Sequence, residues 1–336
     1  MSNYIHQKTV ESPNGLVEVY TRKFGNDLIK TSFHSMHEAK KAFEQTSDQS
    51  CMGGDSLPNW KLVVNGDSKD GEWIGFGKDE DQCGLPCPKN QNDFVQMLYS
   101  PWSKGIEIVD SFYNEMKESE LNKPRDRRRV VNWSDDNGDD VCRDKLHAGQ
   151  PFWRTTKRRL SAGPASITFF VQVGVLSERH WSETLWRVAS AVAAAELLEE
   201  RGYNVAITAV SHSADTFTKG SSCNVNKLTS INLKEHGQAI DRCSMLNAMS
   251  CWAFRTFWFQ LFGYAVEVGA AAELNSGLGR TKTIGQQECE LLTNDPASFV
   301  FQHTLNKGHA VQAAQAAINV VGSDDWFEWD DDYPLK

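Results

Sequence analysis

The chain has 336 residues, of which 40% are hydrophobic and 24% are charged, and its formal net charge is −9. This composition is ordinary for a folded globular protein. The acidic balance argues against a protein whose main role is to coat nucleic acid, because phosphate binding needs a basic face. The length allows two domains, or one large domain with an N-terminal addition.

Cysteine use and the termini predict a cytoplasmic protein, in the host cytoplasm if a phage encodes it. The eight cysteines are scattered, and Cys243 and Cys251 lie in an apolar stretch where free thiols behave as small hydrophobes, which indicates a reducing compartment. The first eight residues contain no apolar signal core. The most hydrophobic stretch, 239–262, includes Asp241 and Arg242, so we expect a buried helix and not a membrane span.

We expect residues 1–160 to form an irregular α+β region that packs on the main domain. Residues 16–20 (LVEVY) suit a short strand, and residues 36–43 suit one or two helical turns. The stretch 48–92 is rich in turn-forming residues. The second half of 93–121 has the apolar spacing of an amphipathic helix.

A strand–helix–strand unit is the clearest feature of the second half. The run 167–175 (ITFFVQVGV) is almost continuously apolar, as in a strand buried on both faces. A helix over 182–201 ends at Gly202, and a second strand follows at 203–210. We expect 225–233 to form an edge strand.

The later elements complete the prediction of an α/β fold with an open, mostly parallel sheet and helices on both faces. We expect a long central helix over 239–262, a third buried strand at 264–268 and a fourth at 298–304. An Ala-rich helix over 308–321 closes a main domain of residues 161–322. An acidic, aromatic tail, 323–336, follows it.

These elements carry a resemblance to a known family. The strand, helix and strand between Ile167 and Val210, above all AAAELLEERGYNVAI at 193–207, resemble the von Willebrand factor A-like domains of bacteria and tailed phages. The N-terminal half looks like that of uncharacterised proteins of phages and prophages. The resemblance covers about half of the chain. It implies a non-enzymatic binding or adaptor protein that works beside an AAA+ ATPase of the MoxR type.

The sequence departs from this family at its metal site. The family's Asp-x-Ser-x-Ser motif corresponds here to Gln172, Gly174 and Leu176, or to Gly174, Leu176 and Glu178. Neither set supplies the oxygen ligands of a hard divalent ion, so we expect no metal at that site and no cofactor. Polar residues still follow the predicted strands, where open α/β sheets bind ligands: Ser177, Glu178, Ser211, His212, Ser213 and Asp215.

Two other segments offer metal ligands. Cys83 and Cys87, with His34 and His37 upstream and Cys51 between them, could hold zinc, and the alternative is a turn with two chance cysteines. The acidic run 135–140 resembles part of a calcium loop, but it lacks the later bidentate Glu and favours a solvated turn.

A hydrolase is a further alternative. Ser211, His212 and Asp215 lie within five residues, but neighbouring residues at a strand end point in different directions, which favours a polar loop. His303 is predicted to be a hydrogen-bonded core histidine inside a strand. The loop 277–283 (GLGRTKT) could cradle a phosphate but lacks the Walker ending, so an ordinary loop is the default.

Two basic runs, 123–129 and 154–159, support a second function, that of a nucleic-acid-associated factor for single-stranded DNA, transcription or replication. Basic groups interleaved with aromatic rings suit single-stranded nucleic acid, and the alternative is a solvated linker. The candidate residues are Arg127, Arg128, Arg129, Arg154, Lys157, Arg158 and Arg159, with Trp133, Phe152 and Trp153 nearby.

The C-terminal segment DDWFEWDDDYPLK at 324–336 has the composition of a docking peptide. It is similar to the tips of bacterial single-stranded-DNA-binding proteins, although Leu335 replaces their terminal aromatic residue and Lys336 follows it. Alternatively, the tail folds onto its own domain. The residues predicted to contact a protein partner are Trp326, Phe327, Trp329, Asp330, Asp331, Asp332 and Tyr333.

Overall fold

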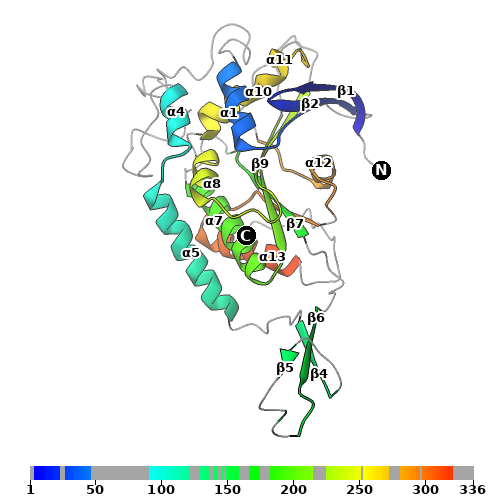
Figure 1. Ribbon diagram of the computed structural model, residues 1–336. Helices are drawn as coiled ribbons and strands as arrows, with labels where there is room; N and C mark the ends of the chain where they lie inside the picture. The colour runs from blue at the N-terminus through cyan, green and yellow to red at the C-terminus, as the bar shows by residue number, and fades with distance from the viewer. Residues whose placement is uncertain are drawn as a thin grey trace.

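The computed structural model describes residues 4–22, 27–46, 91–121, 129–135, 140–141, 146, 149–158, 166–174, 182–214, 225–250, 253–271, 281–295 and 297–320. In this part of the chain the fold is α/β, as predicted, with a mixed seven-stranded sheet (Figure 1). In chain order its strands are β1 (Tyr4–Ser12), β2 (Gly15–Arg22), β3 (Asp27–Phe33), β7 (Ser166–Gln172), β8 (Asn204–Ala214), β9 (Val225–Lys234) and β10 (Ser298–Phe301). Across the sheet their order is β1-β2-β3-β9-β8-β7-β10.

The predicted strand–helix–strand unit is confirmed at the centre of the sheet. β7 and β8 are parallel neighbours, joined through helix α7 (Ser182–Glu200). The helix ends where Gly202 adopts a φ of 86°, which residues with a Cβ rarely adopt. β7 is buried along nearly its whole length because both of its faces are covered: Phe169 and Val171 belong to one core cluster, and Phe170 belongs to the other.

The predicted fourth strand is confirmed as β10, which pairs with the other side of β7 in parallel. β8 and β9 pair antiparallel, with a register shift between Ile207 and Thr208. The chain therefore runs from β7 to β8 on one side, while β10 flanks β7 on the other side.

The N-terminal strands correct two expectations. Residues 4–33 do not pack on the sheet from outside, because β1, β2 and β3 are three of its strands. The predicted edge position of 225–233 is also wrong, because β3 pairs with β9 in parallel from Asp27 opposite Val225 to Phe33 opposite Ile231. Polar residues of β9 are consequently buried.

Helices cover one face of the sheet around the larger core cluster. The predicted helices near 36–43, 93–121 and 308–321 are confirmed as α1 (Met36–Gln45), α5 (Ser103–Leu121) and α13 (Lys307–Val320). α7 packs against both α5 and α13, which lie beside it in Figure 1. The short helix α4 (Gln91–Met97) precedes α5 and contributes Phe94 to the same cluster.

Two predictions between residues 239 and 268 are wrong. The expected long helix is broken into α8 (Arg242–Ala248), a π-helix η2 (Phe254–Trp258) and α10 (Phe259–Phe262). The indole Nε1 of Trp258 donates a hydrogen bond of 2.9 Å to the Ala248 carbonyl, so this segment folds back on itself and buries its rings together. A helix, α11 (Tyr264–Glu267), takes the place of the strand expected at 264–268. The prediction failed because periodicity alone cannot distinguish a short apolar strand from a buried helix.

The other face of the sheet carries a smaller cluster. Phe170, Val210 and Leu228 meet there with Ile284 and with Cys289 of α12 (Gln286–Leu292). The Tyr4 hydroxyl donates to Glu288 Oε1 at 2.9 Å and ties β1 to α12. Burial raises the pKa of the Cys289 thiol to about 12, so this cysteine is an inert part of the core.

Three further strands form a small antiparallel sheet. They are β4 (Arg129–Ser134), β5 (Asp140–Val141) and β6 (Trp153–Arg158), in the order β4-β6-β5. In Figure 1 this sheet lies apart from the seven-stranded sheet, beyond the C-terminal end of α5.

Candidate functional site

The carboxyl ends of β7 and β8 and the amino end of β9 meet at one edge of the large sheet, because β9 runs antiparallel to β8. In open α/β sheets, ligands bind outside the carboxyl ends of the strands, where the connections turn to opposite sides. Five buried polar residues gather at this edge, and we call them the strand-end cluster: Glu183, Arg187, Ser211, Ser213 and Lys227.

Arg187 closes the end of β7. Its side chain comes from the second turn of α7, and the residue is only 4% exposed. Nη1 donates hydrogen bonds of 2.8 Å to the carbonyls of both Gln172 and Gly174, and Nη2 lies 4.0 Å from Glu183 Oε2. Partial burial and then the Arg187 charge lower the pKa of His303, which places that ring near the same edge.

Two serines and a lysine extend the cluster across β8 and β9. Ser213 lies opposite Lys227 in the register, and the two residues are 1% and 3% exposed. The buried hydroxyls of Ser211 and Ser213 have no hydrogen-bond partner within the described ranges. Within the described residues of this cluster, the cations Arg187 and Lys227 accompany one carboxylate, Glu183, and this charge balance disfavours a divalent cation.

The segment 281–283 continues the pairing of β8 beyond the end of β7, since the Lys282 amide donates to the His212 carbonyl at 2.8 Å. Gly174 allows this approach, because a Cβ there would lie 2.2 Å from Thr281 Cγ2. Lys282 Nζ in turn donates to Asn226 Oδ1 at 3.0 Å.

His212 faces away from the two serines. β8 continues to Ala214, so the expected polar loop after Val210 is wrong and residues 211–213 alternate across the sheet. The Nδ1 atom of His212 lies 2.8 Å from the Thr283 carbonyl, which can only accept, so Nδ1 carries the proton of the neutral ring. A triad of Ser211 or Ser213 with His212 is therefore excluded, because hydroxyl and imidazole lie on opposite faces.

Burial of His212 predicts a pH-dependent stability. Burial lowers the pKa of His212 below its ordinary value of 6.5, so the unfolded chain binds a proton that the folded chain does not. The free energy of unfolding should fall as the pH drops below about 6.5, by up to about 1.4 kcal/mol per pH unit from this group. Denaturant titrations at pH 7.5 and 5.5 measure the slope.

The variant His212→Asn retains a donor near Thr283 and should flatten that slope. The matched control is His34→Asn, at an exposed histidine, which should leave the slope unchanged. An equal slope in the wild type and His212→Asn would show that the ring does not titrate on unfolding.

The predicted zinc ligands are not brought together in the described residues. His34 and His37 are exposed at the start of α1, and Cys51, Cys83 and Cys87 lie outside the described ranges. Among the residues that the structure places, no group of three or more His, Cys, Asp or Glu side chains could hold a metal ion. Of the calcium-like run, Asp135 is exposed, Asp140 begins β5, and 136–139 are not described.

Several other predicted residues fall outside the described ranges. They include Leu176, Ser177, Glu178, Asp215, the first part of the glycine-rich loop and the whole C-terminal tail with Trp326, Phe327, Trp329, Asp330, Asp331, Asp332 and Tyr333. His303 was expected inside a buried strand, and this is wrong, because it lies two residues beyond the end of β10 and is exposed.

The basic runs are partly brought together. Arg129 belongs to β4, and Arg154, Lys157 and Arg158 belong to β6, its direct neighbour in the small sheet. Arg127, Arg128 and Arg159 lie outside the described ranges.

Sequence reasoning missed Arg187, Glu183 and Lys227. A signal for the first two was available: Arg187 stands in the mostly apolar stretch 185–195 of the helix, with Glu183 one turn earlier. Lys227 was missed because 225–233 was expected to be an edge strand, and a lysine on an edge strand is normally exposed to solvent.

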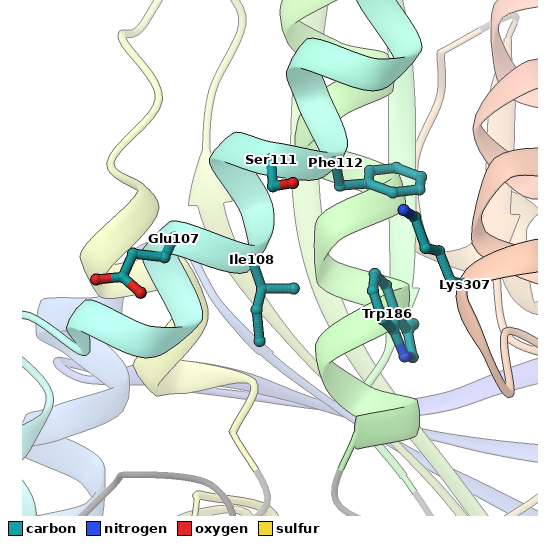
Figure 2. A pocket seen from close by; sticks show the side chains of 6 residues that line it. All are labelled: Glu107, Ile108, Ser111, Phe112, Trp186 and Lys307. Atoms are coloured by element: carbon teal, nitrogen blue, oxygen red, sulfur yellow. The ribbon is translucent and has the colours of Figure 1, made fainter.

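A hollow open to solvent lies between α5, α7 and α13. Figure 2 shows its lining: Glu107, Ile108, Ser111, Phe112, Trp186 and Lys307. Its volume of about 190 Å³ is below that of ordinary small-molecule sites, and Lys307 is already paired with Glu115 at 2.5 Å. We therefore assign no ligand to it.

Comparison with known proteins gives a family without an assigned activity. In the described part of the chain, no helix is long and apolar enough to cross a membrane. No curated protein and no solved structure matches the chain. One family profile matches residues 13–320, which is most of the chain. The chain therefore belongs to the family described as a domain of unknown function, DUF7192.

Proposed function

We propose that the protein is a non-enzymatic binding or adaptor protein of phage or bacterial type, which works in the cytoplasm beside an AAA+ ATPase of the MoxR type. The resemblance to von Willebrand factor A-like domains is the source of this proposal. The parallel β7–α7–β8 unit, followed by β9 and by β10 on the other side of β7, is consistent with that resemblance.

One observation carries the proposal: the guanidinium of Arg187 bonds the carbonyls at the end of β7, where such domains bind their metal. A permanent cation at this position opposes a divalent ion by charge repulsion. The separation of the serines from His212 argues in addition against hydrolysis.

The test is binding of the full chain to the MoxR-type ATPase encoded in the same genome, measured by biolayer interferometry with magnesium and with EDTA. We expect saturable binding that is equal in both buffers, and no heat of binding when MgCl2 alone is titrated into the chain. A variant with Ser177→Ala serves as the control, because in the sequence Ser177 follows the predicted strand 167–175, where a metal site would need a hydroxyl ligand.

Absence of saturable binding would refute the ATPase partner. A magnesium isotherm that Ser177→Ala abolishes would refute the metal-independent site.

A further inference from the structure

One short segment closes the face of the large sheet that carries the smaller core cluster. We call residues 281–292 the α12 cover: three residues that pair beside the end of β8, then Ile284 and helix α12. The cover gives that cluster two buried apolar side chains, Ile284 and Cys289, while Leu291 and Leu292 are partly buried. In Figure 1, α12 lies on the side of the sheet away from α5. A segment with so few buried apolar contacts is of the kind that opens before the rest of a domain unfolds.

The ring of His212 holds this cover on β8. The residue is 3% exposed, and its Nδ1 donates a hydrogen bond of 2.8 Å to the carbonyl of Thr283. The other ring nitrogen, Nε2, is buried and has no hydrogen-bond partner among the residues that the structure places. A second proton on the ring would have to sit on Nε2, where it would be a buried donor without an acceptor. The closed cover therefore requires the neutral ring.

The charged groups around His212 come from β2 and from the cover itself. Arg22 and Lys282 oppose a charged ring, whereas Glu288 of α12 favours it. Glu288 is already engaged, because its Oε1 accepts a hydrogen bond of 2.9 Å from the hydroxyl of Tyr4 on β1. Burial of the ring is the largest effect, and it lowers the pKa of His212. The electrostatics thus agree with the hydrogen bonding that the closed cover disfavours a charged ring.

From this arrangement we propose that the α12 cover is a pH-dependent conformational switch: protonation of His212 opens residues 281–292 while the helix-covered face of the sheet stays folded. In the open state the ring is hydrated, so it carries its charge without the cost of burial. Opening also breaks the contact of Tyr4 with α12 and exposes Val210 and Leu228. The switch is independent of the adaptor role proposed above.

The direction of the switch follows from proton linkage. The pKa of His212 is lowered in the closed state and returns to its ordinary value of 6.5 once the ring is hydrated. The open state therefore binds more protons than the closed state, so opening is favoured as the pH falls below about 6.5. The population of the open state should rise by up to about tenfold per pH unit until the ring of the closed state is protonated as well.

Hydrogen exchange of the full chain, followed by mass spectrometry at pH 7.5 and pH 5.5, tests the proposal. After correction for the intrinsic exchange rate at each pH, the protection of amides in 281–292 should fall by up to about tenfold between the two conditions. At pH 5.5 these amides should be at least about tenfold less protected than those at the centre of α7, which exchange only when the whole domain unfolds. Low urea concentrations should accelerate exchange in α7 but not in the cover, because local opening exposes little surface.

Three variants identify the group that takes up the proton. His212→Asn should remove the pH dependence from the exchange of the cover. His34→Asn, at an exposed histidine, is the matched control and should behave like the wild type. Glu288→Gln keeps an oxygen for the Tyr4 hydroxyl and should retain the pH dependence. The wild-type comparison needs no variant, so it remains decisive if one of these changes impairs folding.

Several results would overturn the proposal. Equal protection of the cover and of α7 at pH 5.5 would mean that the cover opens only with the whole domain. Protection of the cover that is the same at both pH values would show that no proton drives its opening. A pH dependence that survives His212→Asn, or disappears in Glu288→Gln, would assign the proton to another group.

Discussion

Replacement of Arg187 by methionine is expected to destabilise the protein by about 3–5 kcal/mol, as when one partner of a buried ion pair is removed. Methionine has a similar length, so the loss comes from polar groups and not from a cavity. The Gln172 and Gly174 carbonyls would lose their donor, and the Glu183 carboxylate would lose its neighbouring charge in a buried site. An unsatisfied buried polar group costs about 1–3 kcal/mol.

Urea unfolding followed by circular dichroism and tryptophan fluorescence measures this effect, and coincident transitions are the check that one free energy describes it. Arg201→Met, at an exposed arginine just beyond the same helix, is the control and should change stability by less than about 0.5 kcal/mol. The stability loss of Arg187→Lys should lie between those of Arg187→Met and Arg201→Met. The lysine ammonium keeps the positive charge but lacks the planar guanidinium that donates to both carbonyls. A loss below about 1 kcal/mol for Arg187→Met would contradict the role assigned to this residue.

Replacement of Lys234 by methionine should cost about 3 kcal/mol. Lys234 ends β9 and is 1% exposed, with its ammonium 2.6 Å from Glu199 Oε1 and 2.5 Å from the Val205 carbonyl. It joins α7, β8 and β9 at the edge opposite the strand-end cluster. Glu199 is partly exposed and keeps some hydration, so the loss should be smaller than that for Arg187.

A double-mutant cycle isolates this contact. Glu199→Gln alone should cost about 1 kcal/mol, and the two changes should be non-additive by at least about 0.5 kcal/mol because the groups touch. Lys41→Met, at an exposed lysine, is the matched control. Additivity of Lys234→Met and Glu199→Gln would show that the ion pair contributes nothing.

The sequence pattern within a single segment was sufficient to predict the elements that are buried along nearly their whole length. β7 and α7 are surrounded by core residues, so apolar runs and a glycine stop were sufficient to find them. β1 was missed because most of its side chains are exposed and carry no apolar alternation. The position of β9 was missed for another reason: its pairing with β3 is non-local, and no local pattern reports a partner that lies at the other end of the chain.

The site was harder to predict than the fold. Arg187, Lys227 and Ser213 come from three separate elements, and only the sheet register and the helix packing bring them to one edge. The basic runs were visible as composition, but their pairing as β4 and β6 depends on residues about 25 positions apart. Such convergence is a property of tertiary structure and not of spacing.

Because β3 pairs with β9, the large sheet cannot be completed until most of the chain has been synthesised. Roughly 200 residues separate Asp27 from its neighbour Val225, and a ribosome adds about 5–20 residues per second. The N-terminal hairpin therefore waits about 10–40 seconds before the strand that completes its sheet has been made. During that interval Leu28, Ile29 and Phe33 lack the strand beside which they are buried in the finished fold. The nascent chain is thus most exposed to misassociation before its central strand emerges, which is the interval in which chaperones act on slow, non-local sheets.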